Sequence, residues 1–219
     1  MKLMMNNFTQ IICVVGKSNP DGILMLGTGF IISRSGLIVT TKHVVGSDDS
    51  RLVLLMPHIN LFDEYQDISN TRCNAVPIKI KEIDPIKDLC ILQAIGITCN
   101  SILPTLGSLD NVHIGDKVNI FGFPHCVEGR RVLTYQETEI GAKILLDSNG
   151  VKSKHAVINT QSRPGQSGSM IYHQPTNSVV GVLTGAYAPH SGISIGGINP
   201  RELHQTSHCI SAEYINKML

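Results

Sequence analysis

The sequence predicts an all-β protein whose strands form a sandwich or closed barrels. Short apolar runs rich in Ile, Val and Leu recur along the chain, and Gly, Pro, Asn and Asp separate them. No helical pattern of about 10 to 15 residues lies between these runs, which argues against a parallel sheet with alternating helices. Hydrophobic residues make up 42% of the 219 residues, enough to bury a sizeable core.

The apolar runs that we expect to form strands are 11–15, 22–33, 36–41, 51–56, 75–80, 89–95, 117–123, 142–146, 155–160, 170–173 and 179–187. The last nine residues differ from these runs. Ser211 is a good helix N-cap, Glu213 follows in the first turn, and apolar residues recur at helical spacing, so we expect a short C-terminal helix over 211–219. The stretch from Asn100 to Asn111 is the expected crossing between two halves of the chain.

The overall composition argues against several classes of partner. Lys and Arg number 18 against 17 Asp and Glu, so a formal charge of +1 gives no long-range attraction for nucleic acid or anionic lipid. No apolar stretch reaches the roughly 18 to 20 residues of a membrane helix. Residues 1–10 lack the apolar run of an export signal. We therefore expect a soluble, cytoplasmic protein with no nucleic-acid or membrane partner.

The six cysteines are far apart, and several lie inside apolar runs. We interpret them as reduced, buried thiols rather than disulfide partners. No Cys-x-x-Cys pair occurs, and adjacent His-Cys pairs are a poor geometry for chelation. The sequence thus predicts no metal site and no cofactor. The cysteines are Cys13, Cys73, Cys90, Cys99, Cys126 and Cys209.

The strongest local signal for chemistry is the run GQSGS at 165–169. Glycines beside Ser167 allow a sharp turn that can direct two backbone N–H groups at a developing oxyanion. A Gly-Ser-rich turn alone is common and is not specific. Because a serine hydroxyl is a weak nucleophile, catalysis also needs a histidine base and a carboxylate that orients this base.

Candidates for both groups lie upstream of Ser167. His43 interrupts the apolar run GLIVTTKHVV, and Asp88 begins the run DLCIL. Taken alone, His43 could be a core histidine and Asp88 an acid at a strand start. The chain order His, Asp, Ser makes a catalytic triad the better interpretation. An α/β-hydrolase would present serine first, then an acid and histidine, and no Asp follows Ser167.

Several motifs resemble trypsin-like peptidases of the chymotrypsin fold, and most closely the protease domain of the HtrA (Deg) family. The motifs are GTGF with GLIVTTKHVV, EIDPIKDLCIL, IGDKVNIFGFP, VINTQSRPGQSGSMIY, VVGVLTGAY and HCISAEYINKML. They run through nearly the whole chain. The resemblance implies a chymotrypsin-like double β-barrel in one peptidase domain over 1–219, with a first barrel over 1–100, a second over 101–210 and the closing helix over 211–219.

The resemblance also implies roles for individual residues. Ser167 would be the nucleophile, His43 the general base and then acid, and Asp88 the group that holds the imidazole tautomer. The backbone N–H groups of Gly165 and Ser167 would form the oxyanion hole. The residues expected to bound the specificity pocket and the substrate strand are Gln161 to Pro164 on one side and Thr184, Gly185 and Ala186 on the other.

The chain departs from its relatives at some positions. Ser169 stands where the family usually has a second glycine, which leaves Ser169 as an alternative nucleophile. Gln166 replaces the aspartate that pairs with a new N-terminal amine in digestive trypsins, so that activation switch is absent. No segment resembling the family's PDZ domain follows the helix. No Asp lies at the pocket base to select Arg or Lys, and Arg163 would either recruit an acidic group or face water.

We therefore expect a serine endopeptidase that acts on protein or peptide substrates, with narrow specificity or activation by a regulatory protein partner. Two other classes of function remain open. One is a catalytically silent module that binds extended peptides along the strand at Thr184, against which the intact triad argues. The other is a structural protein of the same fold, which would leave the triad as coincidence.

Overall fold

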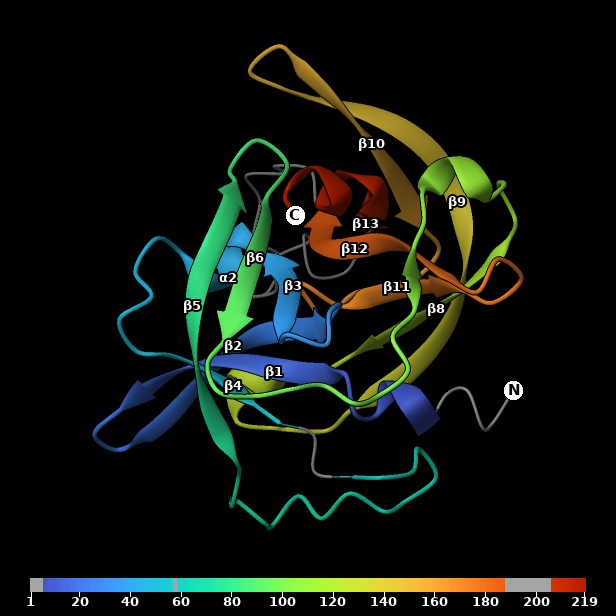
Figure 1. The fold of residues 1–219 in the computed structure, drawn as a ribbon. Coiled ribbons are helices and arrows are strands. Elements are labelled where there is room, and N and C mark those ends of the chain that lie inside the picture. The colour runs from blue at the N-terminus through green and yellow to red at the C-terminus, as the bar shows by residue number, and fades with distance from the viewer. Residues whose placement is uncertain (1–5, 57–58, 188–205) are drawn as a thin grey trace, which may run out of the picture.

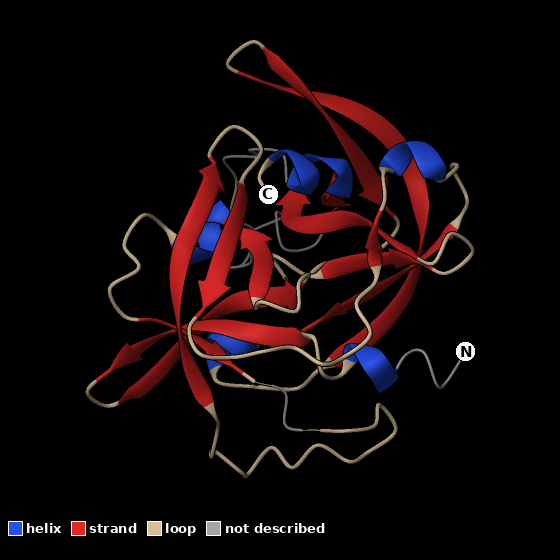
Figure 2. Ribbon diagram, viewed as in Figure 1, coloured by secondary structure: helices blue, strands red, loops and turns tan. Residues whose placement is uncertain are grey.

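Strands account for most of the regular structure, and the helices are few and short (Figure 2). The computed structural model describes residues 6–56, 59–187 and 206–219. Within them the strands form two antiparallel barrels that pack side by side (Figure 1). The chymotrypsin-like double β-barrel expected from the sequence is therefore confirmed.

The first barrel has six strands and closes in the order β1-β2-β3-β6-β5-β4. Its strands are β1 (Ile12–Asn19), β2 (Gly22–Ile31), β3 (Leu37–Thr41), β4 (Leu52–Leu55), β5 (Ala75–Asp84) and β6 (Leu89–Ala94). All five residues of β3 are buried, because this strand lies between β2 and β6 and faces the barrel core on one side and packed structure on the other. A four-residue helix, α2 (Lys42–Val45), follows β3 directly.

The second barrel closes through six strands, β11-β8-β9-β10-β13-β12, because β12 also pairs with β11. The short β7 adds to β12 in parallel. Two 3₁₀ turns, η1 and η2, lie in its connections. The elements are β7 (Thr105–Leu106), η1 (Leu109–Asn111), β8 (Lys117–Gly122), η2 (Cys126–Glu128), β9 (Thr134–Ser148), β10 (Val151–Ile158), β11 (Met170–His173), β12 (Ser178–Tyr187) and β13 (Thr206–Ser211).

Three details differ from the sequence-based expectation. The strand β13 is one of them, since none of the apolar runs expected to form strands covers 206–211. The expected 142–146 run is only part of the C-terminal half of the much longer β9, in which Tyr135, Glu137 and Glu139 are exposed and alternate with more buried residues. The closing helix is a 3₁₀ helix, η4 (Ala212–Lys217). Ser211 does occupy its N-cap, but the side chain accepts the N–H of Leu109 at 3.1 Å instead of capping the helix.

The core consists of two clusters of buried apolar side chains. One lies inside the second barrel and includes Ile140, Ile158 and Cys209. The larger one fills the first barrel and continues between the barrels, where Phe121 contacts Phe8 at a ring-centroid distance of 5.1 Å. Burial of this apolar surface is the main force that joins the two barrels.

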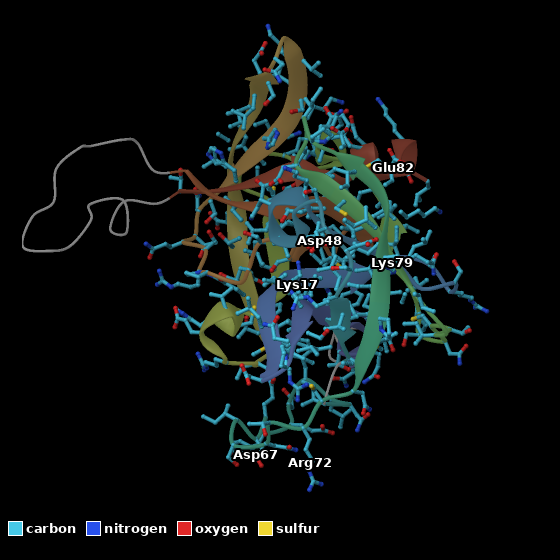
Figure 3. The ribbon with its side chains drawn as sticks, turned by 90° about the vertical axis from the view of Figure 1, so that its left-hand side faces the viewer. Lys17, Asp48, Asp67, Arg72, Lys79 and Glu82 are labelled. Carbon is cyan, nitrogen blue, oxygen red and sulfur yellow. The ribbon has the colours of Figure 1, made fainter. Side chains whose placement is uncertain are left out.

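A long loop, described over residues 59–74, leads into β5 and reaches the second barrel. Figure 3 shows Asp67 and Arg72 on this loop at the bottom of the view. Gln66 exchanges two hydrogen bonds of 2.8 Å with the backbone of Leu133, and Arg131 donates to the Arg72 carbonyl at 2.8 Å. The loop is thus fixed to the connection that leads into β9.

All six cysteines are free thiols in the described residues. Five are buried, but Cys73 on the long loop is exposed, so the expectation that all six are buried is wrong for this residue. Burial raises the pKa of the Cys126 and Cys209 thiols to about 12. Across the described ranges, no helix has both the length and the apolar character that crossing a membrane requires.

Candidate active site

His43 is the second residue of α2, and this short helix begins directly after β3. Val44 and Val45 of the same helical turn are buried and fix it to the barrel, whereas 47% of the His43 side chain is exposed. Gly46 ends the turn with a positive φ of 70°, a conformation that costs glycine little. The imidazole is therefore accessible on a turn that is fixed by apolar packing.

Asp88 lies in the turn between β5 and β6 and has a φ of +54°. Its Oδ2 is 2.5 Å from Nδ1 of His43, and its Oδ1 accepts the His43 backbone N–H at 2.9 Å. The Asp88 carbonyl accepts the N–H of Lys42 at 3.0 Å. Left-handed backbone is tolerated by aspartate better than by most residues. This conformation lets one residue hold both the ring and the backbone of His43.

Ser167 lies half-buried in the loop between β10 and β11. All five carbonyl groups from 163 to 167 accept hydrogen bonds, which is the satisfaction expected of buried backbone. In chain order the donors are Gln166 N–H, His125 N–H, the Thr28 hydroxyl, Ser169 N–H and Thr28 N–H. The turn is closed further by the Gln166 side chain, 2% exposed, whose Oε1 accepts the Arg163 N–H at 2.7 Å.

The N–H groups of this loop show a different pattern. Those of Gln166, Gly168 and Ser169 donate to backbone carbonyls. No acceptor among the described residues takes the N–H of Gly165 or of Ser167. Since a trans peptide directs its N–H opposite to its C=O, the bond from His125 to the Pro164 carbonyl (2.6 Å) turns the Gly165 N–H away from His125.

The loop packs against the helix that carries His43. A Cβ atom added to Gly27 would lie 2.7 Å from the Val44 side chain and 3.1 Å from the Ser167 carbonyl oxygen. Gly27 therefore lies next to both the Val44 side chain and the Ser167 carbonyl, and a methyl group at this position would crowd both. The structure thus brings His43 and Asp88 into direct contact, and it brings the Ser167 carbonyl to the same glycine as Val44, the chain neighbour of His43. No hydrogen bond in the described residues joins the Ser167 hydroxyl to the imidazole. Such bonds are often long before substrate binds.

Ser169, the alternative nucleophile, points elsewhere. Its side chain is fully buried, its Oγ has no hydrogen-bond partner in the described structure, and it packs against Gly122. A Cβ atom on Gly122 would lie within 3.0 Å of the Ser169 Cβ. The hydroxyl of Ser169 therefore has no access to a substrate.

The residues expected at the specificity pocket lie in two segments. Thr184 sits in a β-bulge between Leu183 and Gly185, and its hydroxyl donates to the His208 carbonyl at 3.0 Å. Gly185 has a φ of +144°, and a Cβ added to it would meet no described atom within 4 Å, so this part of β12 is open. Ala186 follows in the strand and pairs with Ser207.

On the other side, Pro164 is exposed and Gln161 is half-buried. Arg163 is exposed as well, and its guanidinium donates to the Gln161 side chain. The geometry therefore uses Arg163 in a local contact at the surface.

Two residues that position the loop have no role that sequence reasoning could assign. Thr28 stands in the sequence only as part of a motif, and His125 only as the neighbour of a cysteine. His125 has a left-handed backbone, with a φ of +62°. Nothing in a single sequence marks either as a contact of the loop, because Thr28 acts from the other barrel and His125 from a distant connection of the same barrel.

The site holds no metal-binding arrangement in the described part of the chain, where no cluster of three or more His, Cys, Asp or Glu side chains could bind an ion. What the arrangement offers instead is an imidazole oriented by a carboxylate, and a loop that carries the Ser167 hydroxyl and two N–H donors with no acceptor in the described structure.

Comparison of the sequence with known proteins finds peptidases in each case. The family described as a trypsin-like peptidase domain matches residues 27–182. The magnetosome formation protease MamE of Paramagnetospirillum magneticum is 26% identical over 194 residues, covering 82% of this chain and 24% of that protein. A probable periplasmic serine endoprotease, DegP-like, of Brucella suis is 26% identical over 173 residues, covering 78% and 29%. The chain thus spans less than a third of the length of these relatives.

Solved structures show the same fold at lower identity. The MamO protease domain from Magnetospirillum magneticum superposes with a TM-score of 0.70 at 14% identity, covering 96% of both chains. The HtrA-type protease AlgW, solved with a decapeptide, gives a TM-score of 0.66 at 17% identity and covers 97% of this chain and 65% of that one.

Proposed function

Because the chain belongs to the trypsin-like peptidase domain family and is related to HtrA serine proteases, we propose that it is a serine endopeptidase with His43, Asp88 and Ser167 as its triad. The observation that carries this proposal is the pattern of backbone donors in the nucleophile loop. Of the residues from 165 to 169, only Gly165 and Ser167 keep N–H groups without an acceptor in the described structure. These are the two donors that an oxyanion hole needs.

The proposed reaction has two steps. The Ser167 hydroxyl attacks the scissile carbonyl carbon while Nε2 of His43 takes its proton, and the N–H groups of Gly165 and Ser167 stabilise the resulting oxyanion. The tetrahedral intermediate expels the amine, which receives that proton from His43, and leaves an acyl group on Ser167. Water then attacks the ester by the reverse sequence and releases the acid.

Asp88 has a defined part in this scheme. The imidazole gains a proton in the first step, and the carboxylate 2.5 Å from Nδ1 stabilises the imidazolium that forms. Because the same carboxylate also holds the His43 N–H, the ring is kept in one orientation. This supports an orienting role for Asp88 rather than a role as proton acceptor.

We further propose that substrates bind as extended peptides along β12. The strand is open at Gly185, whose missing side chain leaves room for a ligand backbone. The AlgW structure, which has a peptide bound, supports peptides as the substrate class. Narrow specificity, a regulatory partner and a cytoplasmic location stay predictions.

Labelling with a fluorophosphonate probe tests the proposal. Such probes react with an activated serine, so we expect labelling of the wild-type chain at Ser167, located by mass spectrometry. The label should disappear in Ser167→Ala and persist in Ser169→Ala. Label on Ser169 would contradict Ser167 as the nucleophile, and a folded wild-type chain that does not react would contradict the proposal and favour a binding module.

A further inference from the structure

Thr28 of β2 is a fully buried polar residue that contacts the nucleophile loop from the opposite barrel. Its hydroxyl donates to the Gly165 carbonyl at 2.8 Å and accepts the Phe123 N–H at 3.0 Å. Its own N–H donates to the Ser167 carbonyl at 3.0 Å. A threonine hydroxyl has a single proton to donate, and here both this proton and one lone pair are used.

These contacts act on the conformation of Gly165. Its φ is +91°, and its two flanking peptides are held separately. The His125 N–H binds the carbonyl before Gly165, and the Thr28 hydroxyl binds the carbonyl of Gly165 itself. Only the first of these peptide planes contains the N–H of Gly165, and the second meets it at the Gly165 Cα. The Thr28 hydroxyl therefore fixes the peptide plane next to this donor and, with it, the position of the Gly165 Cα.

Thr28 is also bonded to the strand that leads to His43. The Thr40 hydroxyl, in β3, donates to the Thr28 carbonyl at 2.7 Å. The approach of the loop at this point is close, because a Cβ on Gly168 would lie 2.1 Å from the Thr28 carbonyl oxygen. One residue thus connects the strand before the base with the loop that carries the nucleophile.

We propose that Thr28 is a positioning residue for the peptidase reaction, which it serves by holding Gly165 and Ser167 against the first barrel through its hydroxyl and backbone. This inference rests on the proposed function. Thr28 does not touch the substrate in this scheme. Its effect should therefore fall on the chemical step rather than on substrate binding, because the oxyanion donors act only as charge develops.

The experiment compares two pairs of variants that differ in the hydroxyl alone. Wild type is compared with Thr28→Val, and Thr28→Ser with Thr28→Ala. Each protein is first checked for folding by circular dichroism, and kcat and KM are measured on a peptide that wild type cleaves. The control is Thr138→Val in β9, because Thr138 is 7% exposed and its hydroxyl has no partner in the described structure.

We expect Thr28→Val to lower kcat about 100-fold, the loss typical of a misplaced catalytic group, with KM changed less than about threefold. The kcat of Thr28→Ser should stay close to that of wild type, and the kcat of Thr28→Ala should be as low as that of Thr28→Val. The control Thr138→Val should have the wild-type kcat. If Thr28→Val does not fold, the Ser and Ala pair still isolates the hydroxyl.

Other results would overturn the inference. A Thr28→Val or Thr28→Ala variant with the wild-type kcat would do so, and so would a serine variant as weak as the alanine variant, which would assign the effect to packing of the methyl group. The two proposals fail in different ways. A wild-type chain that never reacts at Ser167 overturns the proposed function, whereas a reactive wild type with fully active hydroxyl-deleted variants overturns only the role of Thr28.

Discussion

Asp88 binds His43 at two points, with one carboxylate oxygen 2.5 Å from the ring Nδ1 and the other accepting the backbone N–H at 2.9 Å. The first contact sets the tautomer of the imidazole, and the second sets the position of the helical turn that carries it. An ordinary surface ion pair would fix neither the tautomer nor the turn. Long exposed side chains lose entropy when they are held in one geometry, so such pairs are weak. Asp88 therefore orients both the imidazole ring and the backbone of His43.

We expect Asp88→Asn to lower kcat by about 10⁴-fold, since an amide favours the wrong imidazole tautomer. Asparagine tolerates the φ of +54° at this position, so the fold should be retained. Peptide hydrolysis measures the first effect and thermal unfolding the second. Asp48→Asn is the control, because Asp48 forms an exposed pair with Lys17 at 2.7 Å, visible in Figure 3. A similar loss of kcat in Asp88→Asn and Asp48→Asn would contradict an orienting role for Asp88.

Gln166 should matter through its side-chain oxygen. Gln166→Met preserves the length of the side chain but removes the acceptor for the Arg163 N–H, and we expect about a 10- to 100-fold lower kcat. Loss of the acceptor should also cost about 1 kcal/mol of unfolding free energy, measured in urea. Gln174→Met, at an exposed turn, serves as the control. Wild-type kcat in Gln166→Met would show that the turn holds without this bond.

Two glycines with similar backbone angles should respond differently to alanine. Gly150, in the β9–β10 turn, has a φ of +80° and no neighbour within 4 Å of an added Cβ, so Gly150→Ala should cost about 1 to 2 kcal/mol from backbone strain alone. Gly168 has a φ of +86°, but the added Cβ would lie 2.1 Å from the Thr28 carbonyl oxygen. Gly168→Ala should therefore cost at least about 2 kcal/mol more. Equal unfolding free energies in urea would argue against the close approach.

His155 should make stability depend on pH. Burial, and secondly the nearby His208, lowers the pKa of His155 from its ordinary 6.5 to about 4. Because the unfolded chain then binds more protons than the folded one between these values, stability is complete above about pH 6.5 and is lost as the pH falls toward 4. At pH 5 the loss should be about 1 to 2 kcal/mol.

The measurement is urea unfolding at pH 7.5 and pH 5.0 for wild type, His155→Gln and His113→Gln. The glutamine at 155 should remove this part of the pH dependence. The His113 variant should not, because the His113 side chain is 86% exposed. An unchanged pH dependence in His155→Gln would show that other groups account for it.

Much of the molecule could be predicted from the chain alone. Strands such as β3 and β6 are continuous apolar runs, so their type and place follow from local pattern. β13 could not be predicted in this way, because TSHCIS mixes polar and apolar residues and becomes a strand only between β10 and β12. The short closing helix could be predicted, but its 3₁₀ geometry and the hydrogen bond from the Leu109 N–H to the side chain of its N-cap serine could not.

The candidate site, too, could be predicted from the sequence only in part. Residue types and their order pointed to His43, Asp88 and Ser167, because the chemistry of a serine nucleophile requires a base and a carboxylate. Only the tertiary structure decided that Ser169 is buried, that the N–H groups of Gly165 and Ser167 find no acceptor among the described residues, and that Thr28 binds the carbonyls of Gly165 and Ser167. The physical reason is that these facts depend on contacts between segments far apart in the sequence, some of them between the two barrels, and such contacts leave no periodic signal in the sequence.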